Sequence, residues 1–141
     1  MRSRTSGASA RNGIVEVDAL FDTNILIDYL NGIAAAKEEL ARYRTAYISQ
    51  ITWVEVMVGA DPEEESVVRG FLSRFVVVPI DEDVSEAAVR IRRFTRLRVP
   101  DAIIRATAEI RGVIIVTRNS RDFDKSDPSI RVPYVLTESK Q

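Results

Sequence analysis

The sequence predicts an α/β sandwich built on a mostly parallel sheet. Short apolar runs rich in β-branched residues alternate along the chain with segments of helical periodicity, as in sheets whose parallel strands are joined by helices. Glycine, proline and capping residues separate these segments. The 141 residues suit a single domain with one core. No apolar run approaches the ~20 residues needed to cross a bilayer.

The first predicted strand covers residues 19–21, a short apolar run that stops at Asp22. Residues 24–30 have helical character, and Asn31-Gly32 is a typical helix stop. A second helix is expected over 34–44.

Residues 1–16 are rich in Ser, Gly, Ala and Arg and lack the apolar stretch of a secretory signal. We expect them to form a disordered N-terminal extension, followed by one domain over residues 17–141.

The middle of the chain continues the alternation. Tyr47-Ile48 is a short predicted strand, and Ser49 is a suitable N-cap for a helix that ends near Gly59. Proline and acidic residues at 61–65 favour the first turn of the next helix, where the helix macrodipole stabilises negative charge.

The second half begins with an apolar, β-branched run at 75–80, which predicts a buried strand. Asp81 or Asp83 then starts a long helix that reaches about residue 97. A further helix is predicted over 100–112, because it opens with proline and ends at glycine.

The last predicted elements are a strand at 113–116, a polar loop at 117–127 and a strand at 133–136. Because Pro133 is tolerated at a sheet edge, we place the final strand there.

The chain contains neither histidine nor cysteine. This composition excludes a Ser-His-Asp triad, a cysteine nucleophile, a histidine general base and zinc sites made of imidazole or thiolate. Any enzymatic chemistry must therefore use carboxylates, which favour hard cations such as Mg²⁺ or Mn²⁺. The absence of cysteine also fits a reducing cytoplasm, where we expect the protein.

Charge is balanced overall, with 20 basic and 21 acidic residues, but it is unevenly distributed. Residues 86–121 contain nine arginines and three acids. Such an excess suits a face that neutralises phosphates. The alternative is that these arginines are solvated or paired with acids of the 61–65 and 81–86 clusters.

Acidic or amide side chains occur near strand ends or in early helix turns at four places: Asp22, Glu55, Asp101 and the Asn119/Asp122 pair. Ligands of open α/β sheets bind outside the carboxyl ends of the strands, so these groups can face one crevice. Clustered carboxylates repel one another, and a divalent cation reverses that cost. Two such ions would hold a scissile phosphate and activate its attack by water. The pattern predicts phosphodiester hydrolysis.

Each acid also has a plainer interpretation. Asp22 could only cap the following helix, and Glu55 could lie on the polar face of an amphipathic helix. Asp101 could be a first-turn acid stabilised by the helix dipole, and Asp122 could be a turn residue. Their joint placement favours the functional interpretation.

Four segments resemble the PIN-domain ribonucleases, and within them the VapC-like toxins of bacterial toxin–antitoxin pairs. They are FDTNILIDYL at 21–30, ISQITWVEVMVGA at 48–60, VPDAIIRATAEIRGVIIVT at 99–117 and RNSRDF at 118–123. The resemblance implies a three-layer α/β sandwich with a mostly parallel central sheet of four to five strands. It also implies a metal-dependent endoribonuclease that uses Mg²⁺, which Mn²⁺ can replace.

The resemblance assigns roles to particular residues. Implied catalytic residues are Asp22, Glu55, Asp101, Asp122 and Asn119, and the implied metal ligands among them are Asp22, Glu55 and Asp101. How Asn119 and Asp122 share the fourth position is left open.

Further residues are expected around this site. Side chains that support it through hydrogen bonds are Thr23, Asn24 and Thr117. Arginines expected to contact or guide RNA are Arg118, Arg121, Arg92, Arg93, Arg96 and Arg98. Arg105 departs from the family, whose members usually carry a small residue there. At that spacing it could pair with Asp101 or meet a phosphate.

The resemblance also implies partners: an RNA substrate, a small antitoxin protein and a second copy of the chain in a homodimer, which the antitoxin can enlarge into a higher complex. No membrane partner is expected.

Other interpretations remain. A haloacid-dehalogenase-type phosphatase would usually have a second Asp where this chain has Asn24, and a receiver domain would need a lysine after a late strand, where Thr117-Arg118 stands. A PIN-like module that binds RNA or a partner without cutting is the alternative that is not an enzyme.

Overall fold

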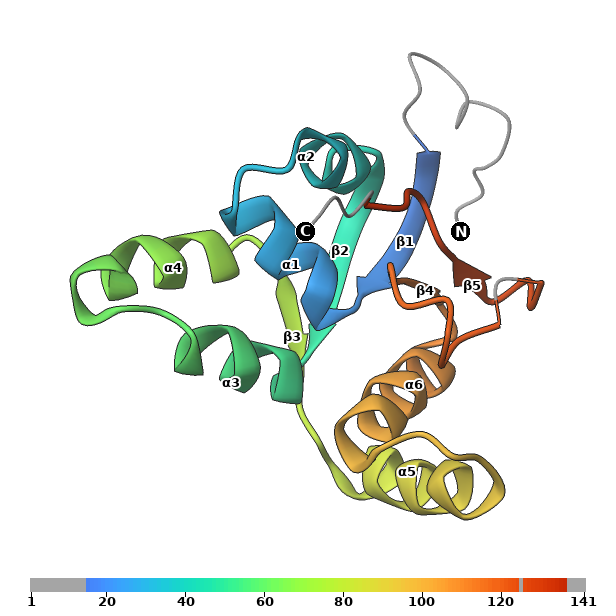
Figure 1. Ribbon diagram of the computed structural model, residues 1–141. Coiled ribbons are helices and arrows are strands. Elements are labelled where there is room, and N and C mark those ends of the chain that lie inside the picture. The colour runs from blue at the N-terminus through green and yellow to red at the C-terminus, as the bar shows by residue number, and fades with distance from the viewer. Residues whose placement is uncertain (1–14, 125, 137–141) are drawn as a thin grey trace.

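The computed structural model describes residues 15–124 and 126–136, and its strands form one all-parallel sheet. The strands are β1 (Val15–Phe21), β2 (Tyr43–Ser49), β3 (Val76–Val78), β4 (Ile114–Val116) and β5 (Ile130–Arg131). Their order is β3-β2-β1-β4-β5, with β1 at the centre (Figure 1). The predicted α/β class and the parallel sheet of four to five strands are confirmed.

Helices cover both faces of this sheet and make the outer layers of a three-layer sandwich. The helices are α1 (Thr23–Leu30), α2 (Ala34–Leu40), α3 (Gln50–Val58), α4 (Glu65–Leu72), α5 (Glu82–Phe94) and α6 (Val99–Arg111), with a 3₁₀ turn η2 (Pro62–Glu64) before α4. Figure 1 shows α5 and α6 together on one side and α1 to α4 on the other. None of the helices in the described parts of the chain is long and apolar enough to span a membrane.

Side chains that alternate between the two faces of the sheet divide the core into two hydrophobic clusters. Leu20 and Ile115 pack with α5 and α6, whereas the next residues, Phe21 and Val116, pack with α1 to α4. Because successive side chains of a strand point to opposite faces, the central strands must be apolar on both sides. This is why β4 and the last three residues of β1, Ala19 to Phe21, are continuous apolar runs.

Local capping fixes where several helices begin and end. The Ser49 hydroxyl accepts a hydrogen bond from the Ile51 amide at 3.2 Å, and Asp81 accepts one from Val84 at 2.9 Å. Gly112 ends α6 with a φ of 71°, in the left-handed region that favours glycine. The predicted N-caps at Ser49 and Asp81 are confirmed.

Several predicted boundaries were wrong, and three of them change how the strands are assigned. β1 begins at Val15 and so includes two residues assigned to the N-terminal extension. α2 ends at Leu40 because residues from Tyr43 onward pair with β1 as β2. The last strand is β5, which pairs with β4, and not 133–136. Residues 1–14 of the predicted extension and 137–141 of the predicted domain lie outside the described residues.

Candidate active site

Asp22 stands at the carboxyl end of β1 and is buried, with 4% of its surface exposed. It caps α1, since Thr23 N–H donates to its Oδ1 at 2.7 Å. Its Oδ2 accepts the Thr117 hydroxyl at 2.8 Å and the Asn24 amide at 3.3 Å. The capping interpretation is therefore correct, but it does not compete with a functional role. The same contacts hold the carboxylate in one orientation at the end of the central strand.

Thr23 connects Glu55 to Asp22, because it makes a hydrogen bond to each of the two carboxylates. The Thr23 hydroxyl donates to Glu55 Oε1 at 2.6 Å and lies 2.9 Å from the Thr52 hydroxyl. Because a hydroxyl has one proton and a carboxylate only accepts, Thr52 must donate to Thr23. Thr52 is fully buried and was not predicted as a site residue. Its spacing of three residues before Glu55, on the same helix face, was the available signal.

Asp101 lies in the first turn of α6. Burial raises the pKa of this carboxyl, nearby Arg98 lowers it, and the negative charges of Asp122 and Glu55 raise it again. Arg98 Nε is 3.6 Å from Asp101 Oδ2, longer than a hydrogen bond. Within the described residues this buried oxygen has no hydrogen-bond partner. A buried carboxylate oxygen without a hydrogen-bond donor lowers the stability of the fold unless a cation binds it.

Asn119 and Asp122 form one unit in the loop after β4. Asn119 Nδ2 donates to Asp122 Oδ2 at 2.9 Å, while Asn119 Oδ1 accepts the backbone amides of Arg121 and Asp122. The Thr117 hydroxyl also accepts a hydrogen bond from the backbone N–H of Asn119 at 2.9 Å. In this arrangement the Asn119 amide orients the Asp122 carboxylate.

Asn119→Asp is expected to strengthen Mn²⁺ binding and to destabilise the protein without metal. The substitution removes the donor that orients Asp122 and places two carboxylates side by side, a repulsion that a divalent cation relieves. Calorimetric titration with Mn²⁺ and thermal unfolding in EDTA measure the two effects. Unchanged Mn²⁺ affinity would mean that position 119 does not face the metal.

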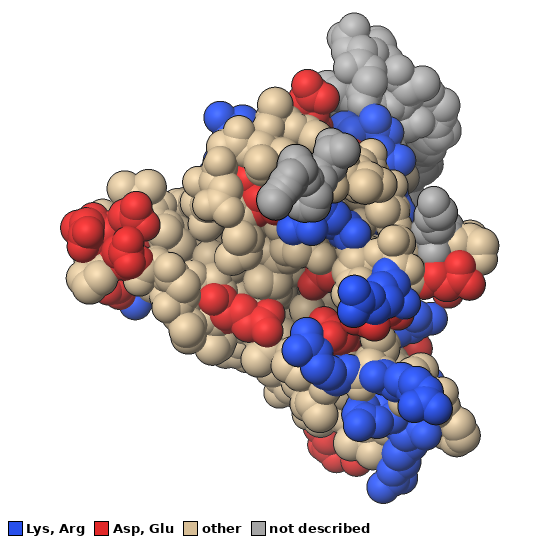
Figure 2. Space-filling view, viewed as in Figure 1, with Lys and Arg blue, Asp and Glu red and all other residues tan. Residues whose placement is uncertain are grey.

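The four acids share one electrostatic neighbourhood. Burial, helped by the charges of Asp101 and Glu55, raises the pKa of Asp22 to about 6 against the hydrogen bonds from Thr117 and Thr23 that lower it. Asp101 is influenced in turn by Asp122 and Glu55. In Figure 2 acidic side chains lie at the centre of the view, between α1 and α3 on one side and α6 on the other.

The acids are neighbours but are not drawn into a tight cluster. Among the residues that the structure describes, no group of three acidic side chains is close enough to form a ready-made metal site. The donor set still fits a hard divalent cation, because all its charged members are carboxylates and Asp101 has an oxygen without a partner. Residues that would hold such an ion are Asp22, Glu55, Asp101 and Asp122.

The arginines near the site have more specific partners than the sequence indicated. Arg118 binds the carboxylate of Asp28 through two nitrogens, at 2.7 and 3.0 Å, so its guanidinium is turned to a buried acid and not toward a free phosphate site. Arg105 pairs with Asp127 at 3.3 Å and not with Asp101. The predicted pairing of Arg105 with Asp101 was therefore wrong.

The other five arginines that are expected from the sequence to contact or guide RNA are exposed. They are Arg92, Arg93, Arg96, Arg98 and Arg121. The first three line an open depression at the C-terminal end of α5. Figure 2 shows positive side chains gathered over α5 and α6 beside the acidic centre.

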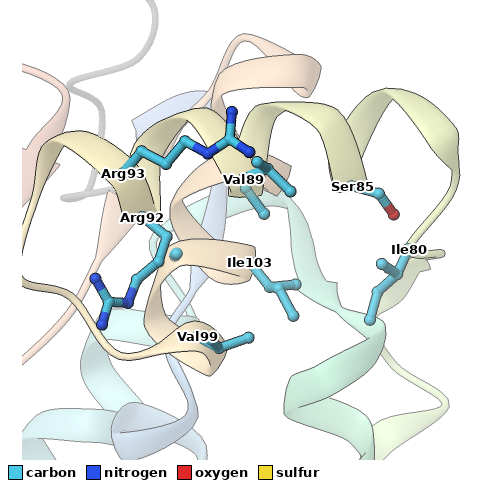
Figure 3. Close-up of a pocket in the computed structure, with 9 residues that line it drawn as sticks. Ile80, Ser85, Val89, Arg92, Arg93, Val99 and Ile103 are labelled. Carbon is cyan, nitrogen blue, oxygen red and sulfur yellow. The ribbon is translucent and has the colours of Figure 1, made fainter.

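An apolar groove of about 350 Å³ lies away from the acids, between α5 and α6 (Figure 3). Ile80, Val89, Val99 and Ile103 line it, and arginines stand at its rim. The groove contains no acidic side chain, so it is not part of the carboxylate site.

Fold and site together define a class of protein: an α/β domain that collects carboxylates at the carboxyl end of a parallel sheet, the donor set of enzymes that use divalent cations on phosphodiesters. The PIN domain family model matches residues 19–127. The chain belongs to the PIN domain family, and the predicted resemblance is confirmed.

Individual relatives are VapC proteins. The chain is 32% identical over 118 residues to the tRNA(fMet)-specific endonuclease VapC of Shigella flexneri, covering 75% of this chain and 89% of the relative. It is 29% identical over 125 residues to Ribonuclease VapC10 of Mycobacterium tuberculosis, covering 81% and 94%. A toxin–antitoxin complex from Klebsiella pneumoniae contains a chain that is 43% identical, with a TM-score of 0.79, over 84% of this chain and 99% of that one.

Proposed function

We propose that this protein is a VapC-type toxin, an endoribonuclease that hydrolyses RNA phosphodiester bonds with Mg²⁺ or Mn²⁺. The observation that carries the proposal is that three acids from distant parts of the sequence, Glu55, Asp122 and Asp22, lie within electrostatic range of Asp101, whose buried Oδ2 has no hydrogen-bond partner in the described residues. The VapC relatives named as endonucleases or ribonucleases support the same activity.

A divalent ion held by the four acids Asp22, Glu55, Asp101 and Asp122 would supply positive charge that polarises the phosphate and activates water. Neighbouring side chains of the protein orient the carboxylates. Thr117 and Thr23 fix the two oxygens of Asp22, and Thr23 also holds Glu55. Such fixed acceptors need no rearrangement as charge develops on the substrate.

Exposed arginines over α5 and at the site loop are proposed to contact RNA. Arg121 lies beside Asp122, and Arg92, Arg93 and Arg96 extend the positive surface away from the acids. Phosphate contacts of this kind fix the position of the strand without reading its sequence. Arg98 lies beside Asp101. Arg118 is left out of this surface because Asp28 binds its guanidinium.

The proposed partners follow from the relatives. The similar chain from Klebsiella pneumoniae belongs to a toxin–antitoxin complex, so we propose a small antitoxin protein that restrains this chain in the cytoplasm.

We also propose a homodimer formed through α5 and the apolar groove of Figure 3. The exposed side chains of α5 are acidic near its start, at Glu82 and Glu86, and basic in its last turn, at Arg92 and Arg93. Two antiparallel copies related by a two-fold axis would therefore match opposite charges around a central, 46% exposed Val89.

Val89→Asp is expected to convert the dimer to a monomer without unfolding it. The substitution buries a charge at the centre of the proposed contact. Light scattering after size-exclusion chromatography gives the mass, with the exposed Val67→Asp on α4 as the matched control. A wild-type monomer at micromolar concentration, or a variant that stays dimeric, would contradict this interface.

One alternative is a PIN-like module that binds RNA or a partner without cutting. Arg98 beside Asp101 and the lack of a ready-made metal cluster in the described residues favour it.

The distinguishing experiment incubates antitoxin-free protein with total bacterial RNA and Mg²⁺ or Mn²⁺, with and without EDTA, beside Asp22→Ala. Discrete cleavage that needs both the metal and Asp22 is expected. RNA binding without any cleavage under these conditions would favour the binding module.

A further inference from the structure

Asp28 is a buried acid that the proposed mechanism does not use. It lies on α1, with 4% of its surface exposed. Arg118 Nε donates to its Oδ2 at 2.7 Å and Arg118 Nη2 to its Oδ1 at 3.0 Å. The Tyr134 hydroxyl donates to the same Oδ2 at 2.8 Å. A carboxylate on α1 thus joins the loop after β4 to the segment after β5.

Helix α1 holds residue 118 at two points. Asn24 Oδ1 accepts the backbone amide of Arg118 at 3.2 Å, and Asp28, one turn further along the same face, binds the guanidinium. Backbone and side chain of one loop residue are therefore both fixed to a helix whose N-cap is Asp22.

The residues on either side of Arg118 hold the acids of the site. Thr117 donates its hydroxyl to Asp22, and Asn119 donates its amide to Asp122. A displacement of residue 118 would move both partners together. The distance between the first and fourth acids thus depends on where α1 anchors the loop.

We propose that Asp28 is a positioning residue for the carboxylate site. It acts through Arg118 to hold the loop that carries Asn119 and Asp122 at a fixed distance from Asp22. This inference rests on the proposed function, since it concerns the same site, but it adds a residue and a device that the reaction itself does not require.

A plain stabilising role would not explain why an ion pair is used. Asp28 is buried although the Arg118 side chain is one-third exposed, and desolvation of the carboxylate offsets much of the attraction in such a pair, so an apolar contact would serve stability about as well. The bidentate contact instead fixes the orientation of the Arg118 side chain, because a guanidinium and a carboxylate align in one plane. That property suits a loop that must present a metal ligand.

The chain contains a matched control. Glu39 on α2 is 3% exposed and binds Arg131 through two nitrogens, at 2.6 and 2.9 Å, and the Tyr43 hydroxyl at 2.8 Å. Its hydrogen bonds are thus of the same kind as those of Asp28, from one arginine and one tyrosine, and Arg42 Nε lies further away, 3.8 Å from Glu39 Oε1. Its arginine belongs to β5 and not to the loop with Asn119 and Asp122.

The test compares Asp28→Asn with Glu39→Gln in the full chain. Three measurements are made well below the unfolding temperature of each variant: hydrogen exchange of the amides of residues 119, 121 and 122 without metal, Mn²⁺ affinity, and RNA cleavage. For Asp28→Asn we expect faster exchange at these amides and about a 10- to 100-fold loss of Mn²⁺ affinity and of cleavage. Glu39→Gln should lose stability but keep all three close to wild type.

Equal effects of the two substitutions, or wild-type exchange and Mn²⁺ affinity in folded Asp28→Asn, would overturn the proposal. Should Asp28→Asn fail to fold, Tyr134→Phe and Tyr43→Phe replace the pair. Each then removes one hydrogen bond, and only the first should weaken Mn²⁺ binding, by about threefold to tenfold. Because exchange and Mn²⁺ affinity do not depend on RNA cleavage, they decide the role of Asp28 even if the wild-type protein cuts no RNA.

Discussion

Asp22→Asn is expected to abolish RNA cleavage and, in metal-free protein at neutral pH, to stabilise the fold. The wild-type carboxylate is buried beside Asp101 and Glu55, and its pKa is raised from 3.8 to about 6. At neutral pH the folded protein therefore carries a charge that the site disfavours. Asparagine removes that charge while keeping nearly the same shape.

The sign of this effect follows from proton linkage. The folded state holds the Asp22 proton more tightly than the unfolded state, so this group stabilises the fold below pH 3.8 and loses that contribution as pH rises through about 6. A shift of this size corresponds to about 3 kcal/mol. In the variant, an NH₂ group at the position of Oδ2 would face the Asn24 side-chain NH₂, so two donors meet and a hydrogen bond is lost. This loss costs about 1 kcal/mol of stability. The expected net gain is about 2 kcal/mol, or roughly 4–8 °C in Tm.

Thermal unfolding of both proteins in EDTA, at about pH 4.5 and about pH 7.5, measures this difference. The variant should be the more stable at the higher pH, and the advantage should shrink at the lower pH, where wild-type Asp22 is protonated. Saturating Mn²⁺ should stabilise the wild type and reverse the order. A variant that is less stable at neutral pH would show that the Asp22 charge is well accommodated without metal.

Asp101→Asn is expected to lower cleavage by at least about a thousandfold, because it removes a charged group from the point where the substrate phosphate must be neutralised. The fold should persist, since Asp101 Oδ2 makes no hydrogen bond within the described residues. RNA binding should be kept or slightly strengthened, because one negative charge near the phosphate is lost.

Asp83→Asn is the matched control for this substitution. Asp83 is an exposed acid in the first turn of α5 and therefore makes the same kind of favourable contact with a helix dipole. Single-turnover cleavage and RNA affinity are measured for both variants. Wild-type turnover in Asp101→Asn would remove this residue from the catalytic set, and an equal loss in Asp83→Asn would attribute the effect to helix stability.

Sequence periodicity was sufficient for the fold class because the central strands are apolar on both faces and the helices carry clear caps. It failed where long-range pairing decides the structure. Residues 41–44 continue a helical pattern, yet Tyr43 begins β2 because β1 offers a parallel partner. The apolar run at 133–136 has strand composition, but the Tyr134 hydroxyl binds Asp28 and β5 ends at Arg131.

The acids of the site were predictable because each stands at a strand end or an early helix turn, where α/β folds bind ligands. Their supporting contacts were only partly predictable. Thr23 and Thr117 follow directly from neighbouring motifs, and both make the expected hydrogen bonds. Thr52 and Asp28 were missed, because their partners lie 29 and 90 residues away in the sequence. The pairing of Arg118 with Asp28 was missed for the same reason.

We propose that the four acids form one divalent-cation site that cuts RNA. The most direct test measures Mn²⁺ binding and RNA cleavage in the same samples over a range of Mn²⁺ concentrations. Cleavage should rise with occupancy of the site by Mn²⁺, and both should be lost in Asp22→Asn. Cleavage that persists in EDTA, or that saturates at Mn²⁺ concentrations unrelated to binding, would contradict the proposal.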